Sequence, residues 1–390
     1  MGLGIEFGEL EVKGRREFWK YIDRIGMHNK HREEMYNTLD KMSVIPSNIA
    51  YLVNLIYCNN YADFKGISAD GFPPLEVMND PVQYYLDHHE EDKINFQIEP
   101  FKAMDDYDIY KVSWKTLLRS GWKENDNVTC YFYVPDCAER ITYVVNGYRE
   151  PNWMFQKKMT KRLLNKSAVL YFPLPFHMER CPEIALNGAL MINYAMPRNV
   201  GFAQLPVDLI TAINHLSDPN INYTMNEESM QKSAYIGTSL GAIMGLWAYL
   251  KILEHNKNQG ENIIEFESFI PIIGGVDVPG IIKESEIFKM FHHLINEKNM
   301  ALIHGYDPAN VIDKVDLPLR NVFPVIARYD TIVPTIYGEK MVKMCGIRES
   351  SVLWFRCGHS SIFVEHEEIS KFVNGVINAD KRARFFNQYL

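Results

Sequence analysis

The sequence predicts an α/β protein with a mostly parallel, twisted sheet, helices on both faces of that sheet, and a helical extension at the N-terminus. From about residue 106, short segments rich in β-branched and aromatic residues alternate with longer segments of helical periodicity. Most of the short segments are apolar throughout, which is typical of parallel strands that are buried on both faces. The 390 residues, 47% of them hydrophobic, are enough to bury a large core.

The N-terminal extension, residues 1–105, lacks this alternation. Residues 14–60 carry apolar residues at roughly helical intervals, and we expect a helix there, with a second short helix starting after Pro46. We expect a loop at residues 71–81 and a helical turn at residues 81–92. An extension of this kind could act as a lid, as a platform for a substrate, or as the interface of a homodimer.

The alternating part begins with two predicted strands, at residues 108–114 and 127–136, which could form an antiparallel edge. Further strands are predicted at residues 141–147, 167–175, 233–237, 267–275, 322–330 and 351–358. Helices are predicted between and after them, at residues 151–166, 204–216, 239–255, 285–298, 337–346 and 366–378. Residues 178–203 fit the alternation poorly. We expect a small insertion there, over the carboxyl edge of the sheet, where open α/β folds bind ligands.

Composition and charge exclude several classes of function. The formal net charge is −8 and the pI is about 5.9, so the chain lacks the basic character of a nucleic-acid-binding domain. No apolar run reaches about 18 residues and no secretory signal is visible, so we expect no transmembrane segment. The six cysteines are scattered and form no CxxC pair. They indicate free thiols in a reducing compartment, and we expect a cytoplasmic protein.

The strongest chemical signal is Gly-Thr-Ser-Leu-Gly at residues 237–241, which matches the pattern G-x-S-x-G. A predicted strand runs into this segment and a predicted helix runs out of it. The turn between them is tight, and the pattern requires small residues on both sides of the serine because larger side chains would clash. The serine then lies at a helix N-terminus, which favours negative charge beside it. We therefore predict that Ser239 is a catalytic nucleophile.

With this motif in its strand–turn–helix context, residues 106–380 resemble the α/β-hydrolase superfamily. The resemblance implies a serine, an acid and a histidine in that chain order. Asp330 follows a late predicted strand and matches the acid, and His359 follows the last strand and matches the histidine. Asp277, after the preceding strand, is the alternative acid. His366 is the alternative histidine, but it lies in a predicted helix.

The resemblance also implies the role of each group. His359 would take the proton of the Ser239 hydroxyl, and Asp330 would hold the imidazole in the useful tautomer. The tetrahedral intermediate needs two hydrogen-bond donors aimed at its oxygen. The backbone N–H groups of Leu240 and Tyr148 are the candidates. Residues 146–148 read Asn-Gly-Tyr and resemble the His-Gly-X loop of the superfamily, with asparagine in the place of histidine.

His177 and Arg180 follow the predicted strand at 167–175, would lie near the mouth of the site, and are both candidates for contact with the substrate. Arg180 could bind a carboxylate or phosphate group of a substrate, or it could fix its own loop through internal salt bridges. His177 has no second His, Cys or carboxylate at ligand spacing, so we expect no zinc site. The chain has no Walker loop and no GxGxxG that opens a helix, so we expect no nucleotide cofactor.

Residues 106–390 are therefore expected to form a catalytic domain that hydrolyses a small-molecule acyl substrate through a Ser239 acyl-enzyme. A carboxylic ester is the expected class, and lipid esters, thioesters and small peptides stay open. Transfer of the acyl group to an acceptor other than water would use the same triad. A non-catalytic binding protein on the same scaffold is a further alternative, because fold alone does not prove activity.

Overall fold

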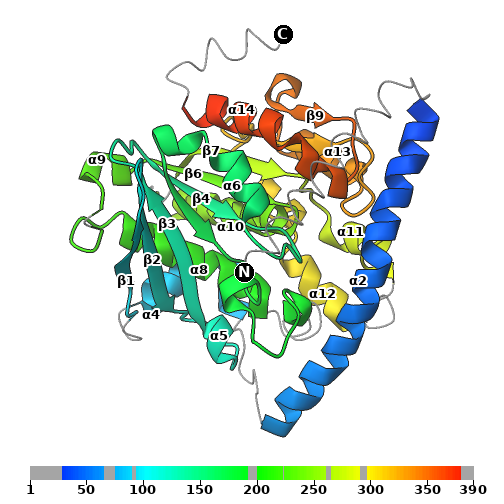
Figure 1. Ribbon diagram of the computed structural model, residues 1–390, viewed down its shortest axis with the longest axis horizontal. Helices are drawn as coiled ribbons and strands as arrows, with labels where there is room; N and C mark the ends of the chain where they lie inside the picture. Colours follow the sequence, from blue (N-terminus) through cyan, green and yellow to red (C-terminus); the bar gives the residue numbers. More distant parts are fainter. Residues whose placement is uncertain are drawn as a thin grey trace.

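A computed structural model of the 390-residue chain describes residues 29–65, 75–89, 94–191, 200–222, 224–260, 265–289 and 297–378 (Figure 1). Within these ranges the strands form one nine-stranded sheet in the order β1-β2-β3-β5-β4-β6-β7-β8-β9. The strands are β1 (Gln97–Ala103), β2 (Asp108–Lys115), β3 (Asn127–Val134), β4 (Ile141–Val145), β5 (Ala168–Phe172), β6 (Ser233–Thr238), β7 (Phe266–Ile272), β8 (Val325–Ala327) and β9 (Leu353–Phe355).

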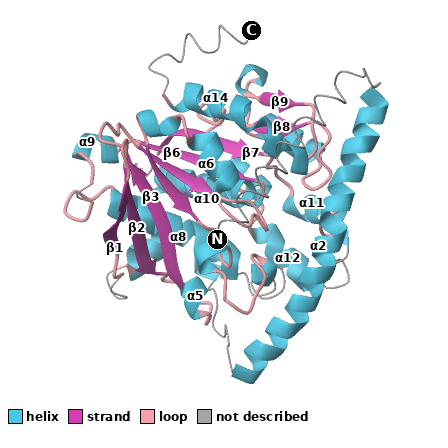
Figure 2. Ribbon diagram, viewed as in Figure 1, coloured by secondary structure: helices cyan, strands magenta, loops and turns pink. Residues whose placement is uncertain are grey.

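The sheet has an antiparallel edge and a parallel remainder. The pairs β1–β2, β2–β3 and β3–β5 are antiparallel, and every pair from β5 to β9 is parallel. The sheet twists strongly between its two ends (Figure 2). The predicted mostly parallel, mixed sheet is therefore confirmed.

The edge strand β1 is a difference from the sequence-based prediction, because it lies within the predicted helical extension. Nearly all of its side chains are exposed, so no alternation of apolar and polar residues reveals it. Its register with β2 shifts next to Pro100, a residue that sheets tolerate at edges and bulges. The sheet thus begins at Gln97 and not at about residue 106.

Helices cover both faces of the sheet, as predicted. On one face lie α4 (Pro81–His88), α8 (Val200–Leu216) and α10 (Leu240–Gln259), which pack against one another. On the other lie α6 (Met154–Thr160) and α14 (His366–Ile377), which contact each other. The side chains of β4 alternate between two cores, because Tyr143 and Val145 join the first face and Val144 joins the second. Burial on both faces explains why the strands are apolar throughout.

The described part of the N-terminal extension is dominated by α2 (Asn29–Lys65), a 37-residue helix that runs along one side of the molecule (Figure 1). The predicted break at Pro46 is wrong, because the helix continues through it. A proline inside a helix costs about 3 kcal/mol. Buried contacts on both sides of the proline offset this cost: Val44 packs in an apolar cluster, and the Asn48 amide donates to the carbonyl of Ile287. The predicted helical residues 14–28 lie outside the described ranges.

The remaining α-helices are α3 (Leu75–Asn79), α5 (Lys123–Asp126), α9 (Glu227–Met230), α11 (Val278–Glu284), α12 (Glu297–Gly305) and α13 (Thr335–Met344). Short 3-10 helices are η1 (Leu163–Asn165), η2 (Met178–Arg180), η5 (Pro308–Asn310), η6 (Ile312–Lys314), η7 (Glu349–Ser351) and η8 (Ser360–Glu365). None of the helices in the described ranges combines the length and apolar character that a membrane span requires.

The helix predicted at residues 285–298 is wrong at its start. A helix, α11, forms earlier because the Asp277 side chain accepts a hydrogen bond from the N–H of Gly280, with a proline in the first turn. Residues 285–289 are not α-helical, and α12 (Glu297–Gly305) covers the last two residues of the predicted helix.

Candidate active site

Ser239 lies on a strained turn between β6 and α10. Its backbone has φ 51° and ψ −113°, a conformation that residues other than glycine rarely adopt. A Cβ atom on Gly237 would lie 2.6 Å from the carbonyl oxygen of Gly241, and a Cβ atom on Gly241 would lie 2.4 Å from the carbonyl oxygen of Asn146. Backbone atoms fill these spaces, so both positions require glycine. The glycines predicted from the motif thus hold the Ser239 turn against its neighbours.

The structure brings Asp330 and His359 together at the carboxyl ends of β8 and β9. Asp330 Oδ2 lies 2.7 Å from His359 Nδ1, and Asp330 Oδ1 accepts the N–H groups of Ile332 and Val333 at 2.9 and 2.8 Å. With both oxygens of Asp330 acting as acceptors, Nδ1 carries the proton. The Nε2 atom of His359 is then left as the basic nitrogen. Ser239 and His359 line the same cavity.

The surroundings of His359 raise its proton affinity. Burial alone would lower the pKa of His359, but the carboxylates of Asp330, Asp40 and Glu150 more than offset this and raise the pKa above its usual value. The imidazolium that forms when the histidine accepts a proton is therefore stabilised. Such a histidine is suited to act as a general base.

Asp277, the alternative acid, is engaged elsewhere. Its Oδ1 atom caps α11 through Gly280, and its Oδ2 atom lies 2.7 Å from the Lys340 ammonium. The structure gives its carboxylate no hydrogen bond to His359 within the described ranges. His366, the alternative histidine, begins α14 and does not line the cavity.

The segment that links β4 to α6 lies directly beside Ser239. A Cβ atom on Gly147 would be 3.3 Å from Ser239 Cβ. Asn146 braces this segment, because its amide donates to the Gly147 carbonyl and its side-chain oxygen accepts the N–H of Leu174. This bracing gives asparagine a structural role at the position where the superfamily has histidine. Tyr148 and Leu240, whose N–H groups are the predicted oxyanion donors, both line the cavity.

His177 does not line the cavity, contrary to the substrate-contact role considered for it. It is fully buried, its Nδ1 atom lies 2.8 Å from the Pro175 carbonyl, and its Nε2 atom accepts the N–H of Arg149 at 3.2 Å. Burial lowers the pKa of His177 to about 4, so it is neutral near pH 7 and protonated on Nδ1. The hydrogen bond from the N–H of Arg149 to His177 Nε2 holds Arg149 in a backbone conformation with φ 64°. His177 thus supports the segment beside Ser239 from behind.

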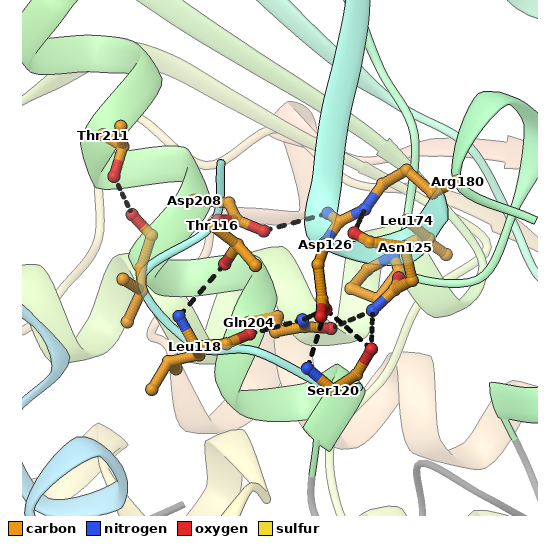
Figure 3. A network of polar contacts seen from close by, with 12 residues as sticks. Thr116, Leu118, Ser120, Asn125, Asp126, Leu174, Arg180, Gln204, Asp208 and Thr211 are labelled. Carbon is orange, nitrogen blue, oxygen red and sulfur yellow. Dashed lines mark hydrogen bonds and ion pairs between the residues drawn. The ribbon is translucent and has the colours of Figure 1, made fainter. Parts of the chain in front are cut away.

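Arg180 is also absent from the cavity wall, so the structure favours the internal role over contact with a substrate. Its side chain is fully buried and lies 2.9 Å from Asp208 of α8. The Arg180 Nε–H donates to the Asn125 carbonyl, and the Asn125 amide donates to Gln204. Figure 3 shows these side chains facing one another in a network that ties the β2–β3 connection, η2 and α8 together. Buried charges are paired in this way to offset the cost of desolvation.

Two acidic residues at the site were not identified from the sequence. Asp40 of α2 is buried, and its carboxylate accepts the N–H groups of His359 and Ser360, both at 3.1 Å. Glu150 is buried in the cavity wall and accepts a hydrogen bond from the Gln156 amide. Burial raises the pKa of Glu150 to about 7. Neither residue belongs to a motif, and the contacts of Asp40 join segments that lie far apart in the sequence.

The cavity has a volume of about 380 Å³, within the range of small-molecule sites. Ser239 and His359 lie in its wall together with polar groups of the segment beside Ser239. A large part of the wall is aliphatic or aromatic, from α11 and its surroundings: Val278, Ile281, Ile282, Ile287, Phe288, Ile332 and Val333. Helix α2 adds Ser43 and Val44. The site can therefore take an apolar group next to a serine, a histidine and backbone donors.

Comparisons with known proteins identify the fold. No family model matches the sequence, and no curated protein matches it. The structure is similar to acetyl xylan esterase 1 from Thermoanaerobacterium sp. JW/SL YS485, with a TM-score of 0.52 and 10% identity over 77% of this chain and 94% of that one. It is also similar to an acetyl xylan esterase from Paenibacillus sp. R4, with a TM-score of 0.51 and 12% identity over 78% of this chain and 99% of that one. At these identities the similarity concerns the fold alone. The chain has the α/β-hydrolase fold.

Proposed function

We propose that the protein is a serine hydrolase that cleaves a carboxylic ester, with Ser239 as nucleophile, His359 as base and Asp330 as acid. One observation carries this proposal: a serine on a strained strand–helix turn shares a cavity with a histidine whose other nitrogen is bound to a buried carboxylate. This is the arrangement that acyl transfer through a serine requires.

In the first step, His359 Nε2 takes the proton of the Ser239 hydroxyl as its oxygen attacks the acyl carbon. The carbonyl oxygen of the substrate becomes an oxyanion, and the N–H groups of Leu240 and Tyr148 donate to it. The imidazolium then protonates the alcohol oxygen, and the bond between that oxygen and the acyl carbon breaks. Asp330 stabilises the imidazolium throughout. In the second step, a water molecule gives one proton to His359 and its oxygen attacks the acyl carbon. The imidazolium returns this proton to the Ser239 oxygen as the bond between that oxygen and the acyl carbon breaks, which releases the acid and restores Ser239 and His359.

The cavity supports an ester with an apolar acyl group. Its aliphatic and aromatic wall offers apolar surface beside the nucleophile, and burial of a CH₂ group contributes about 0.8 kcal/mol. The two structural neighbours are esterases by description, which supports an ester over other acyl compounds. The same steps apply to thioesters and peptides, so these substrates are included in the test.

The test is hydrolysis of p-nitrophenyl esters from acetate to palmitate by the wild type and by Ser239→Ala, a variant that removes only the hydroxyl. We expect measurable wild-type activity and a loss of several powers of ten in kcat for the variant, with an unchanged melting temperature. Equal activity in both proteins would refute Ser239 as nucleophile. If no ester is cleaved, thioester and peptide panels follow, and a further lack of turnover would refute hydrolysis.

A further inference from the structure

One carboxylate of helix α2, that of Asp40, binds the loops of the active site. Asp40 lies on this helix, outside the sheet, and its side chain is 1% exposed. Its Oδ2 atom accepts the N–H of His359 at 3.1 Å and the hydroxyl of Thr331 at 3.2 Å, and its Oδ1 atom accepts the N–H of Ser360 at 3.1 Å. Thr331 follows Asp330 in the sequence. Asp40 thus binds both the loop of the acid and the loop of the base.

The hydrogen-bond donors around Asp40 suit an ionised carboxylate. The hydrogen bonds that the structure gives its side chain come from N–H or O–H donors, which suits a group that only accepts. A Cβ atom on Gly358 would lie 2.9 Å from Asp40 Oδ2, so glycine at that position leaves room for the carboxylate. Burial and the charge of Asp330 raise the pKa of Asp40 above its usual value, and His359 and the N–H groups of Ser360 and His359 offset only part of this rise.

Further contacts hold α2 at this place. The ring of Tyr36 stacks on the ring of Tyr329, with centroids 5.4 Å apart and planes inclined by 10°. The hydroxyls of Ser43 and Ser360 lie 3.1 Å apart. Tyr36, Asp40 and Ser43 are spaced by four and three residues, so they share one face of the helix. That face contacts the residues on both sides of Asp330 and the residue after His359.

We propose that Asp40 is a positioning residue of the active site, which fixes the loop of Asp330 against the loop of His359 and places a second negative charge behind the base. The inference rests on the proposed function of Ser239 and His359. It also assigns a role to the N-terminal extension, because α2 carries Asp40 and holds it against the two loops.

The charge has a consequence that a purely structural contact would not have. The charged groups that act on His359 are Asp330 from the loop after β8, Asp40 from α2 and Glu150 from the loop after β4, and Arg149 and Lys158 line the same cavity. A negative charge at Asp40 stabilises the imidazolium and so raises the pKa of His359. Because the base must be neutral to activate Ser239, activity is lost as the pH falls through this pKa. Removal of the charge at Asp40 should therefore move the acidic limb of the pH–activity profile to lower pH.

The experiment measures the second-order rate constant for labelling of Ser239 by a fluorophosphonate probe from pH 5 to pH 9, in the full chain. The probe reacts with the activated serine whatever the natural substrate is. The variant is Asp40→Asn, and the matched control is Glu33→Gln, which removes one negative charge from an exposed position on the same helix. For Asp40→Asn we expect a plateau that is about 10- to 100-fold lower. We also expect an acidic midpoint about one pH unit lower. Glu33→Gln should follow the wild type.

Thr331→Val is the second variant, since it removes one donor to Asp40 and keeps the charge. We expect a severalfold lower plateau with an unchanged acidic midpoint, so this variant tests the role if Asp40→Asn does not fold. An acidic midpoint of Asp40→Asn equal to that of the wild type would overturn the proposed effect of the charge. A wild-type plateau for Thr331→Val would overturn the positioning of the loops. Failure of the wild type itself to label would instead refute the proposed function.

Discussion

The carboxyl edge of the parallel sheet and helix α2 contribute to the same candidate active site in different ways. The sheet edge supplies Ser239, Asp330 and His359, each from the segment directly after a strand. Helix α2 supplies Asp40, Ser43 and Val44 from a segment outside the sheet and some 200 residues before the nucleophile. The first set follows from topology, because parallel strands bring their carboxyl ends to one edge. The second set depends on how a separate helix packs over that edge.

The largest expected effect is a difference in kcat/KM between variants of two acids at the sheet edge, Asp330 and Asp277. Asp330→Asn removes the carboxylate that binds His359 Nδ1, and it should lower kcat/KM for a p-nitrophenyl ester about 10³- to 10⁴-fold. Asp277→Asn keeps the cap of α11 and loses only a partly exposed pair with Lys340, so its kcat/KM should stay within about twofold of the wild type. The reverse order of the two variants would move the acid to the loop after β7.

A second test concerns Arg180. The sequence predicts this residue at the mouth of the site, whereas the structure places it in a buried network with Asp208. Arg180→Met leaves the Asp208 carboxylate buried and unpaired, and it should lower the free energy of unfolding in urea by about 3–5 kcal/mol. The double variant Arg180→Met with Asp208→Leu should recover most of this loss. Labelling of Ser239 in the folded fraction should be unchanged. A normal stability with weaker substrate binding would instead return Arg180 to the substrate site.

A smaller effect is expected at Glu150, whose pKa is about 7 in the folded protein and about 4.5 in an unfolded chain. The folded state binds the carboxyl proton of Glu150 more tightly than the unfolded chain does. The contribution of Glu150 to the free energy of unfolding is therefore full below pH 4.5 and is lost as the pH rises through 7. The total is about 3 kcal/mol. The free energy of unfolding of Glu150→Gln, measured by urea denaturation, should therefore rise relative to that of the wild type as the pH increases from 5 to 8. A difference that is independent of pH would show that Glu150 is not buried as a protonated carboxyl.

The same comparison shows what the sequence could predict. The strands from β2 to β9 and the Ser239 turn follow from apolar segments and from a motif whose glycines fit against backbone atoms. The exposed edge strand β1 and the continuous helix through Pro46 did not follow, because one has no alternating pattern and the other depends on buried contacts at Val44 and Asn48. Asp40 shows the same limit at the site. Its partners are more than 290 residues away, and nothing next to it in the sequence marks its role.

The most direct test of the central claim is to identify the residue that a fluorophosphonate probe modifies. The wild-type protein is labelled near pH 8, digested, and analysed by peptide mass spectrometry, with Ser239→Ala treated in parallel. We predict one adduct, on the peptide that contains Ser239, and no adduct in the variant. An adduct on another residue, or equal labelling of both proteins, would contradict the assignment of Ser239 as the nucleophile.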